Sequence, residues 1–249
     1  MTTPCRRAVH ALMLSALAST FAGAQSLGPT TRFTIGGNAI LSEPKEGFRQ
    51  NVSNGLGGGG TVMYHLMRSG LLGLRFDASG VAYGKEKKRV PISDTVGSRI
   101  LLNLTTTNSI TTLSWGPELA RPSGRIRPYV NAGYSRLFFR TTSSLGGIDS
   151  EEGSISTTNY KDSTGAWVYG GGLRFALGRS YSPVGLDLGL RYHRGGSASY
   201  LREGSIQDNT DGSVTITPLS SRTPFVVYSI GVKFRIPFNS RKPCSRFLC

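Results

Sequence analysis

Apolar and polar residues alternate along the segment from Pro224 to Phe238. From Tyr228 to Phe238 every second residue is apolar, and the residues between them are small or cationic. Successive side chains of a β-strand point to opposite faces, so this pattern predicts a strand with different surroundings on its two faces. Its length and its aromatic residues at both ends are typical of a strand that crosses a membrane as part of a barrel.

The same alternation recurs in earlier parts of the chain, and each segment is followed by turn-forming residues. Together the segments predict eight strands, at 31–41, 55–67, 70–83, 108–120, 127–140, 164–177, 184–197 and 224–238. The sequence therefore predicts an all-β fold.

The predicted connections between these strands alternate in length. Short connections cover 68–69, 121–126 and 178–183, and long polar ones cover 42–54, 84–107, 141–163 and 198–223. A membrane barrel with both ends in the periplasm has short turns on that side and long loops outside. We therefore expect an eight-stranded antiparallel up-and-down transmembrane β-barrel with short periplasmic turns and long extracellular loops. Within the second long connection, Arg99–Thr107 is a candidate extension of a strand beyond the membrane.

Charged residues within the predicted strands fall mainly on the face opposite the apolar one. A charge on the lipid face costs about 2–4 kcal/mol at the membrane midplane, so these residues are expected inside. The predicted interior charge network contains Arg75, Asp77, Glu118, Arg174, Asp187, Arg191, His193, Lys233 and Arg235. Side chains just fill the interior of an eight-stranded barrel, and buried charges need partners, which predicts a charge-plugged lumen. Because cations outnumber anions in this set, the alternative is a narrow anion-preferring passage.

Aromatic residues gather near the ends of the predicted strands. Amphipathic rings are favourable at the two membrane–water interfaces, so these residues predict an aromatic girdle. Its expected members are Phe33, Tyr64, Trp115, Trp167, Tyr192, Phe225 and Phe238. Ordinary aromatic residues of a β-core remain the alternative.

The two ends of the chain differ from the predicted barrel. Residues 1–24 resemble a secretory signal peptide, with Arg6 and Arg7 before an apolar run and Ala22-Gly23-Ala24 at a cleavage-like site. A membrane anchor is the alternative for this segment. The barrel is then expected at 25–238, followed by a basic tail at 239–249. Cys244 and Cys249 in that tail could pair in an oxidising periplasm, or the tail has no defined role.

The net charge of +15 leaves several classes of partner open. The cations are spread along the chain and form no recognisable nucleic-acid-binding module, so nucleic acid is not expected. Outer-membrane lipid and anionic lipopolysaccharide are the expected partners. The basic cluster Lys85–Arg89 is a candidate contact, and its default interpretation is a solvated loop face. No cofactor or metal is expected, because His65 and His193 lack a surrounding cysteine or carboxylate cluster.

The segment Arg127–Leu137 (RPYVNAGYSRL) is similar to a strand common in small eight-stranded outer-membrane barrels. With the eight strands and the alternating loops, it resembles the OmpA transmembrane domain and OmpX-like proteins of the porin-like outer membrane protein β-barrel family. The resemblance implies an outer-membrane location and recognition of Phe238 by the outer-membrane assembly machinery. Separately, no enzymatic activity is expected. Residues 239–249 depart from it, because they follow the aromatic residue that ends the last strand in such barrels. A closed barrel leaves no free edges, so a monomer is expected.

The expected role is structural support or surface interaction, and several alternatives stay open. One is a small porin-like channel for ions or small solutes. Another is an outer-membrane enzyme that modifies lipid A or phospholipid, for which His193, Ser197, Ser199 and Glu203 would be the candidate residues. A soluble periplasmic ligand-binding barrel is the remaining rival.

Overall fold

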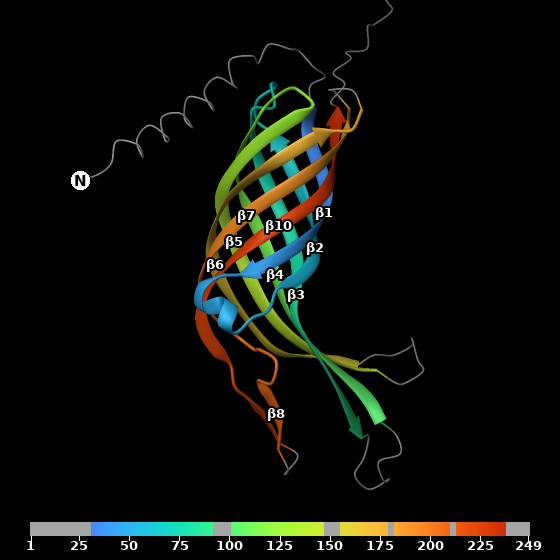
Figure 1. The fold of residues 1–249 in the computed structure, drawn as a ribbon, viewed down its shortest axis with the longest axis vertical. Helices are drawn as coiled ribbons and strands as arrows, with labels where there is room; N and C mark the ends of the chain where they lie inside the picture. Colours follow the sequence, from blue (N-terminus) through green and yellow to red (C-terminus); the bar gives the residue numbers. More distant parts are fainter. Residues whose placement is uncertain (1–30, 92–100, 147–154, 179–181, 210–212, 238–249) are drawn as a thin grey trace, which may run out of the picture.

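The computed structural model describes residues 31–91, 101–146, 155–178, 182–209 and 213–237. Eight long strands form one closed barrel in the order β1-β10-β7-β6-β5-β4-β3-β2, and all neighbours are antiparallel. The elements are β1 (Thr31–Pro44), η1 (Glu46–Gln50), β2 (Gly55–His65), β3 (Leu72–Pro91), β4 (Leu101–Ala120), β5 (Ile126–Gly146), β6 (Ile155–Ala176), β7 (Val184–Tyr200), β8 (Ile206–Asp208), β9 (Val214–Ile216) and β10 (Leu219–Pro237). The predicted eight-stranded antiparallel barrel is confirmed (Figure 1). No helix in the described ranges is long and apolar enough to cross a membrane.

The first and last barrel strands close the barrel. β1 pairs with β10 from Thr31↔Pro237 to Pro44↔Phe225, and its other edge pairs with β2 from Phe33↔Tyr64 to Ser42↔Gly55. Every barrel strand therefore has two neighbours, which satisfies the backbone hydrogen bonds that lipid cannot satisfy.

The two ends of the barrel are different. At one end, which we call the short-turn end, compact connections join β2 to β3, β4 to β5 and β6 to β7, β1 begins and β10 ends. At the other end, which we call the long-ribbon end, η1 lies between β1 and β2, and the small β8–β9 hairpin lies between β7 and β10. In Figure 1 the short-turn end is at the top and the long-ribbon end at the bottom.

The strands at the long-ribbon end are longer than predicted. β3 and β4 pair as far as Pro91↔Leu101, and β5 and β6 pair as far as Leu145↔Ile155. The predicted loops at 84–107 and 141–163 are therefore largely strand, and the candidate extension at 99–107 belongs to β4 from Leu101 onward. These strand extensions were predicted as loops because they are polar. A pair of strands in water has polar residues on both faces, so it lacks the alternation that marks a membrane strand.

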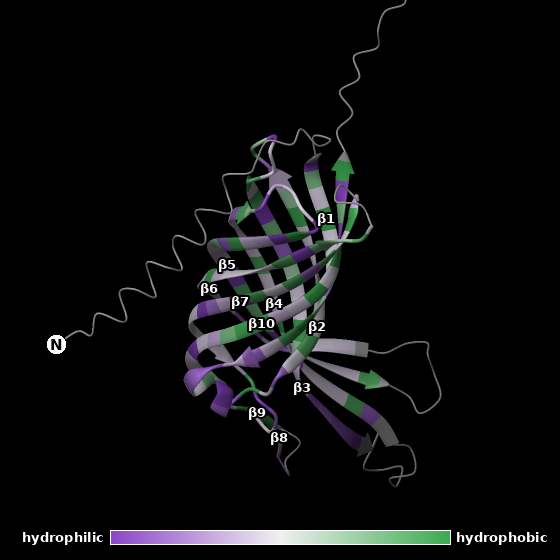
Figure 2. Ribbon diagram, turned by 45° about the horizontal axis from the view of Figure 1, so that its top comes forward, coloured by the Kyte–Doolittle hydropathy of each residue, from purple (hydrophilic) through white to green (hydrophobic). Residues whose placement is uncertain are grey.

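The outer wall of the barrel is apolar along its middle. Exposed side chains such as Leu190, Tyr228, Ile230 and Phe234 come from alternate positions of β7 and β10. Figure 2 shows apolar residues alternating with polar ones along these strands. The inward residues of the same strands include the buried Asp187, Arg191 and Lys233. The period-two pattern therefore separates an apolar outside from a partly ionic inside.

Candidate functional site in the barrel lumen

The half of the lumen nearer the short-turn end holds a network of charges, which we call the ionic layer. It consists of Arg75, Asp77, Glu118, Arg174, Asp187, Arg191 and Lys233. These residues come from β3, β4, β6, β7 and β10, so the layer spans the barrel from wall to wall. Six of the seven are buried, and Arg174 is nearly so.

Arg75 is the centre of one part of the ionic layer. Its Nε lies 2.8 Å from Asp77 Oδ2, and its Nη1 lies 2.9 Å from Glu118 Oε2. Arg191 Nη1 approaches Asp77 Oδ2 from the opposite wall at 2.7 Å, and Thr61 donates a hydrogen bond to Asp77 Oδ1 at 2.7 Å. Arg75 and Asp77 are two residues apart on β3, so both side chains point into the lumen. The Asp77 carboxylate therefore holds two arginines together across the barrel.

Arg174 is the centre of the other part. Its Nη2 lies 2.6 Å from Glu118 Oε1, and its Nε lies 3.4 Å from Asp187 Oδ1. Lys233 Nζ lies 3.6 Å from Asp187 Oδ2. The Tyr129 ring packs under Arg174, whose Cζ is 4.2 Å from the ring centroid, an arrangement that stabilises a cation. Glu118 joins the two parts because it accepts from both Arg75 and Arg174.

The half of the lumen nearer the long-ribbon end is filled by apolar side chains, which we call the apolar layer. It consists of Ile40, Phe48, Val52, Val81, Tyr83, Ile110, Leu137, Phe139, Ala166, Ala198, Tyr200, Phe225 and Val227. Eleven of these residues line the barrel wall, and Phe48 and Val52 enter from the connection between β1 and β2. The lumen is therefore filled by two chemically different layers.

Phe48 of η1 is the plug of the apolar layer. Only 1% of its surface is exposed, and its ring meets the edges of Phe139 and Tyr200 at centroid distances of 6.2 and 5.2 Å. Lys45 N donates to Pro224 O at 2.9 Å, which fixes the start of this segment to β10. The plug was not predicted, because a single phenylalanine in a polar loop gives no periodic signal.

A buried polar seam crosses the lumen beside the apolar layer. Ser114 and Ser135 share a hydrogen bond of 2.8 Å, and Ser135 Oγ lies 3.4 Å from His193 Nδ1. The His193 ring is stacked on Phe225 with a centroid distance of 4.6 Å. His193 thus lies inside the barrel, but it forms no ion pair with the described residues. Its assignment to the charge network is corrected, since its neighbours are hydroxyl and aromatic groups.

Arg235 and the unpredicted Arg127 lie inside the short-turn end, beside the ionic layer. Arg235 donates from Nη2 to Ser182 O at 2.5 Å, and no acidic side chain in the described ranges pairs with it. Its place in the predicted network is corrected on that ground. Arg127 is buried on β5 and also faces the lumen. The alternation of β5 could have identified Arg127, but its position at the end of the predicted strand obscured it.

A model of the outer membrane protein β-barrel domain family matches residues 9–214. The chain belongs to the outer membrane protein β-barrel family. Its location is accordingly the outer membrane, with its apolar wall in contact with lipid. Membership in this family argues against the alternative of a soluble periplasmic ligand-binding barrel.

Several solved structures of outer-membrane barrels are similar to this family member. Ail of Yersinia pestis, in complex with the heparin analogue sucrose octasulfate, is 14% identical, with 83% of this chain and 99% of Ail covered and a TM-score of 0.42. Neisserial surface protein A is 16% identical, with coverage of 82% and 97% and a TM-score of 0.40. A major outer membrane protein from Thermus thermophilus is 14% identical, with coverage of 82% and 99% and a TM-score of 0.42. A search of curated protein sequences gave no match. Likenesses this distant carry no information about function.

The outer wall of this outer membrane β-barrel protein carries paired aromatic rings. Phe33 packs on Tyr64, Trp115 and Trp167 pack on the two sides of Tyr134, and Tyr169 packs on Tyr192; the centroid distances are 5.2–5.7 Å. The structure thus places five of the predicted girdle residues, Phe33, Tyr64, Trp115, Trp167 and Tyr192, in aromatic contacts.

Two further predictions about the end of the chain have different outcomes. Phe225 is not a girdle residue, because the odd-numbered positions of β10 face the lumen and Phe225 lies in the apolar layer. Phe238, Cys244 and Cys249 lie outside the described residues.

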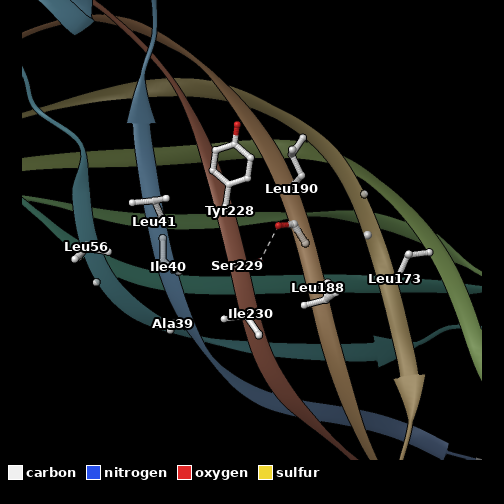
Figure 3. A pocket seen from close by; sticks show the side chains of 14 residues that line it. Ala39, Ile40, Leu41, Leu56, Leu173, Leu188, Leu190, Tyr228, Ser229 and Ile230 are labelled. Atoms are coloured by element: carbon white, nitrogen blue, oxygen red, sulfur yellow. Dashed lines mark hydrogen bonds between the residues drawn. The ribbon is translucent and has the colours of Figure 1, made fainter.

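The outer wall also contains an apolar hollow of about 600 Å³, shown in Figure 3. Leu41, Leu56, Leu188 and Ile230 are among its lining residues. Its one interaction drawn in Figure 3 is the bond from Ser229 Oγ to Gly189 O at 3.4 Å. An apolar hollow that faces lipid suits acyl chains, and it lacks the convergent polar groups of a site for a polar ligand. Among the described residues, no cluster of His, Cys, Asp and Glu side chains could hold a metal ion.

Proposed function

We propose that this protein is a non-conducting, non-enzymatic integral outer-membrane barrel that stabilises the membrane and presents its long-ribbon end at the cell surface. The observation that carries this proposal is the filled lumen. The ionic layer and the apolar layer each cross the barrel, and they lie one behind the other. A solute would have to displace both layers to pass.

The packing of the two layers supports a closed barrel rather than a channel. A small cavity lined by Arg75, Asp77 and Arg191 has a volume of about 10 Å³, which is about what a single water molecule needs. Ion conduction requires a path in which binding is weak enough for the ion to leave. The carboxylates of Asp77 and Glu118 are already paired with arginines at 2.6–2.9 Å, so they do not offer weak binding sites to a passing ion.

The candidate catalytic residues favour a non-enzymatic role. His193 is almost fully buried between Ser135 and Phe225, so a lipid substrate has no access to its ring. Ser197 is exposed, and the carboxylate of Glu203 accepts a hydrogen bond from the backbone of Lys85 at 3.2 Å. A hydrolase triad requires its three groups within hydrogen-bond reach of one another.

The partners that this role implies are outer-membrane lipid and lipopolysaccharide. Lys85, Lys87 and Arg89 lie on the part of β3 that extends beyond the barrel, where anionic groups at the cell surface are within reach. We further propose export by a signal peptide at residues 1–24, insertion by the outer-membrane assembly machinery, and function as a single barrel.

Conductance in planar lipid bilayers tests the closed-barrel proposal. The wild-type protein is expected to give no stable unitary openings after insertion. The mobility shift between unboiled and boiled samples on a denaturing gel verifies that the inserted protein is folded. The double variant Glu118→Ala/Phe48→Ala weakens both layers and is expected to conduct, which shows that the assay detects an open lumen. Stable unitary conductance of the wild-type barrel would overturn the proposal and favour a small pore. Unchanged lipid A and phospholipid profiles with and without the protein are expected, and a changed profile would favour the enzyme.

A further inference from the structure

The short-turn end of the lumen contains more positive than negative charge. The three acids of the ionic layer, Asp77, Glu118 and Asp187, already pair with Arg75, Arg174, Arg191 and Lys233. Arg127 and Arg235 are two additional inward cations, and neither pairs with an acid in the described ranges. Buried charge without a partner is unfavourable, so this end of the lumen lacks counter-charge.

Arg127 is the clearest case. Only 8% of its surface is exposed, and its buried Nε has no hydrogen-bond partner among the described residues. On the neighbouring strand it lies directly opposite Arg174. Like charges directly opposite each other destabilise a pair of strands. Arg174 is engaged by Glu118 and Asp187, so neither acid is free to neutralise Arg127.

Arg235 and His65 complete the same region. Arg235 uses one nitrogen for the Ser182 carbonyl, which leaves its other guanidinium donors available. His65 lies within 2.9 Å of Thr34 Oγ1 through Nε2, and its buried Nδ1 has no partner in the described ranges. Arg127, Arg174, Arg235 and His65 all lie on inward-facing positions at the short-turn end, so they border the same space at this end of the lumen.

We infer that this space binds an oxyanion of the phosphate class. Arg127 and Arg235 would hold it through charge-assisted hydrogen bonds, and His65 would border it. A guanidinium presents several donors in a fixed plane that matches the oxygens of a phosphate group. One bound anion would supply the counter-charge that is missing around Arg127 and Arg235. It would also give the buried Nε of Arg127 a hydrogen-bond acceptor.

Two sources provide this chemistry. One is free inorganic phosphate that enters from the periplasm through the short-turn end. The other is the phosphate group of a phospholipid at the inner face of the outer membrane. The same guanidinium donors serve both, so the two ligands are tested separately.

Equilibrium dialysis of the detergent-folded barrel against radiolabelled inorganic phosphate, at fixed ionic strength in chloride, tests the inference. A parallel series uses dihexanoyl phosphatidic acid below its micelle concentration. We expect saturable binding of about one anion per barrel, and at least a tenfold loss of affinity in Arg127→Met. Saturation by inorganic phosphate identifies the free anion, and saturation by phosphatidic acid alone identifies the lipid headgroup. The absence of saturable binding of both ligands would overturn the inference.

The variants separate a binding role from a structural one. Arg127→Met removes an unpaired cation and leaves no acid without a partner, so it is expected to fold as judged by its mobility shift. Arg127→Lys keeps the charge but loses the planar donors, and should bind with intermediate affinity. Arg125→Met, in the exposed turn that precedes β5, is the matched control and should bind as the wild type does. Equal binding by Arg127→Met and the wild type would also overturn the inference.

Discussion

The ionic layer and the apolar layer fill one tube in two different ways. The ionic layer uses only residues of the barrel wall, and its contacts are directional pairs such as Arg75 with Asp77. The apolar layer needs a segment from outside the wall, because Phe48 and Val52 enter from the β1–β2 connection. Wall residues cannot leave the barrel without unfolding it, whereas a loop can withdraw locally. The ionic layer is therefore tied to the stability of the whole barrel, and the apolar layer is tied to a smaller, separable unit.

The strongest destabilisation should come from removing a shared partner in the ionic layer. Glu118→Ala leaves Arg75 and Arg174 without a common carboxylate in a buried site, and such a loss costs about 3–5 kcal/mol in the free energy of unfolding. Urea unfolding of the barrel in lipid vesicles, followed by tryptophan fluorescence, measures this change. Glu43→Ala removes an acid that pairs with Lys45 at the surface and should have a much smaller effect. Equal losses for the two variants would contradict the importance of the shared carboxylate.

A weaker destabilisation should follow from removing the plug of the apolar layer. Phe48→Ala should cost about 2 kcal/mol, less than a typical buried phenylalanine, because η1 can withdraw from the barrel and need not leave an empty cavity. The single variant should remain non-conducting in planar bilayers, since the ionic layer still crosses the lumen. Arg49→Ala, on the same short helix but exposed, is the control and should leave stability unchanged. Unitary openings in Phe48→Ala would show that the apolar layer alone closes the barrel.

The mildest change concerns the backbone that carries the plug. Glu46 begins η1 with a φ of 51°, a left-handed conformation that is unfavourable for a residue with a Cβ atom. Glu46→Gly removes that strain but adds freedom to the unfolded chain, so the plug should be stabilised by less than about 1 kcal/mol. Protection of the η1 amides in hydrogen exchange should rise slightly, while amides of the ionic layer should not change. Slower exchange in both regions would mean that the two layers are coupled.

The barrel itself was predictable because lipid and lumen impose different residues on alternate positions. The alternation of β7 and β10 predicted both their strand character and the inward direction of Asp187 and Lys233. The lengths of the ribbons were not predictable, because water on both faces removes that contrast. The contacts within the ionic layer were not predictable either. Which arginine meets which acid depends on the stagger between strands, and alternation within one strand does not contain it.

The apolar layer was hidden for a different physical reason. Leu137 and Phe139 face the lumen while Phe138 between them faces outward, so three apolar residues stand in a row. Alternation cannot tell a lipid-facing side chain from an apolar lumen-facing one, which also led Phe225 to be assigned to the girdle. Arg127 was missed because one charged residue at a strand end gives no pattern.

The ribbons at the long-ribbon end have two outer edges with which no further strand of the described residues pairs. Beyond the barrel, β3, β4, β5 and β6 continue to pair as one four-stranded sheet. Within the described ranges, β3 pairs only with β4 beyond Ala82, and β6 pairs only with β5 before Ala166. The β3 edge carries Lys85, Lys87 and Arg89, and charge of this kind opposes the addition of a foreign strand. The β6 edge at residues 155–160 carries no charged side chain, so this part of the sheet lacks that protection against strand addition.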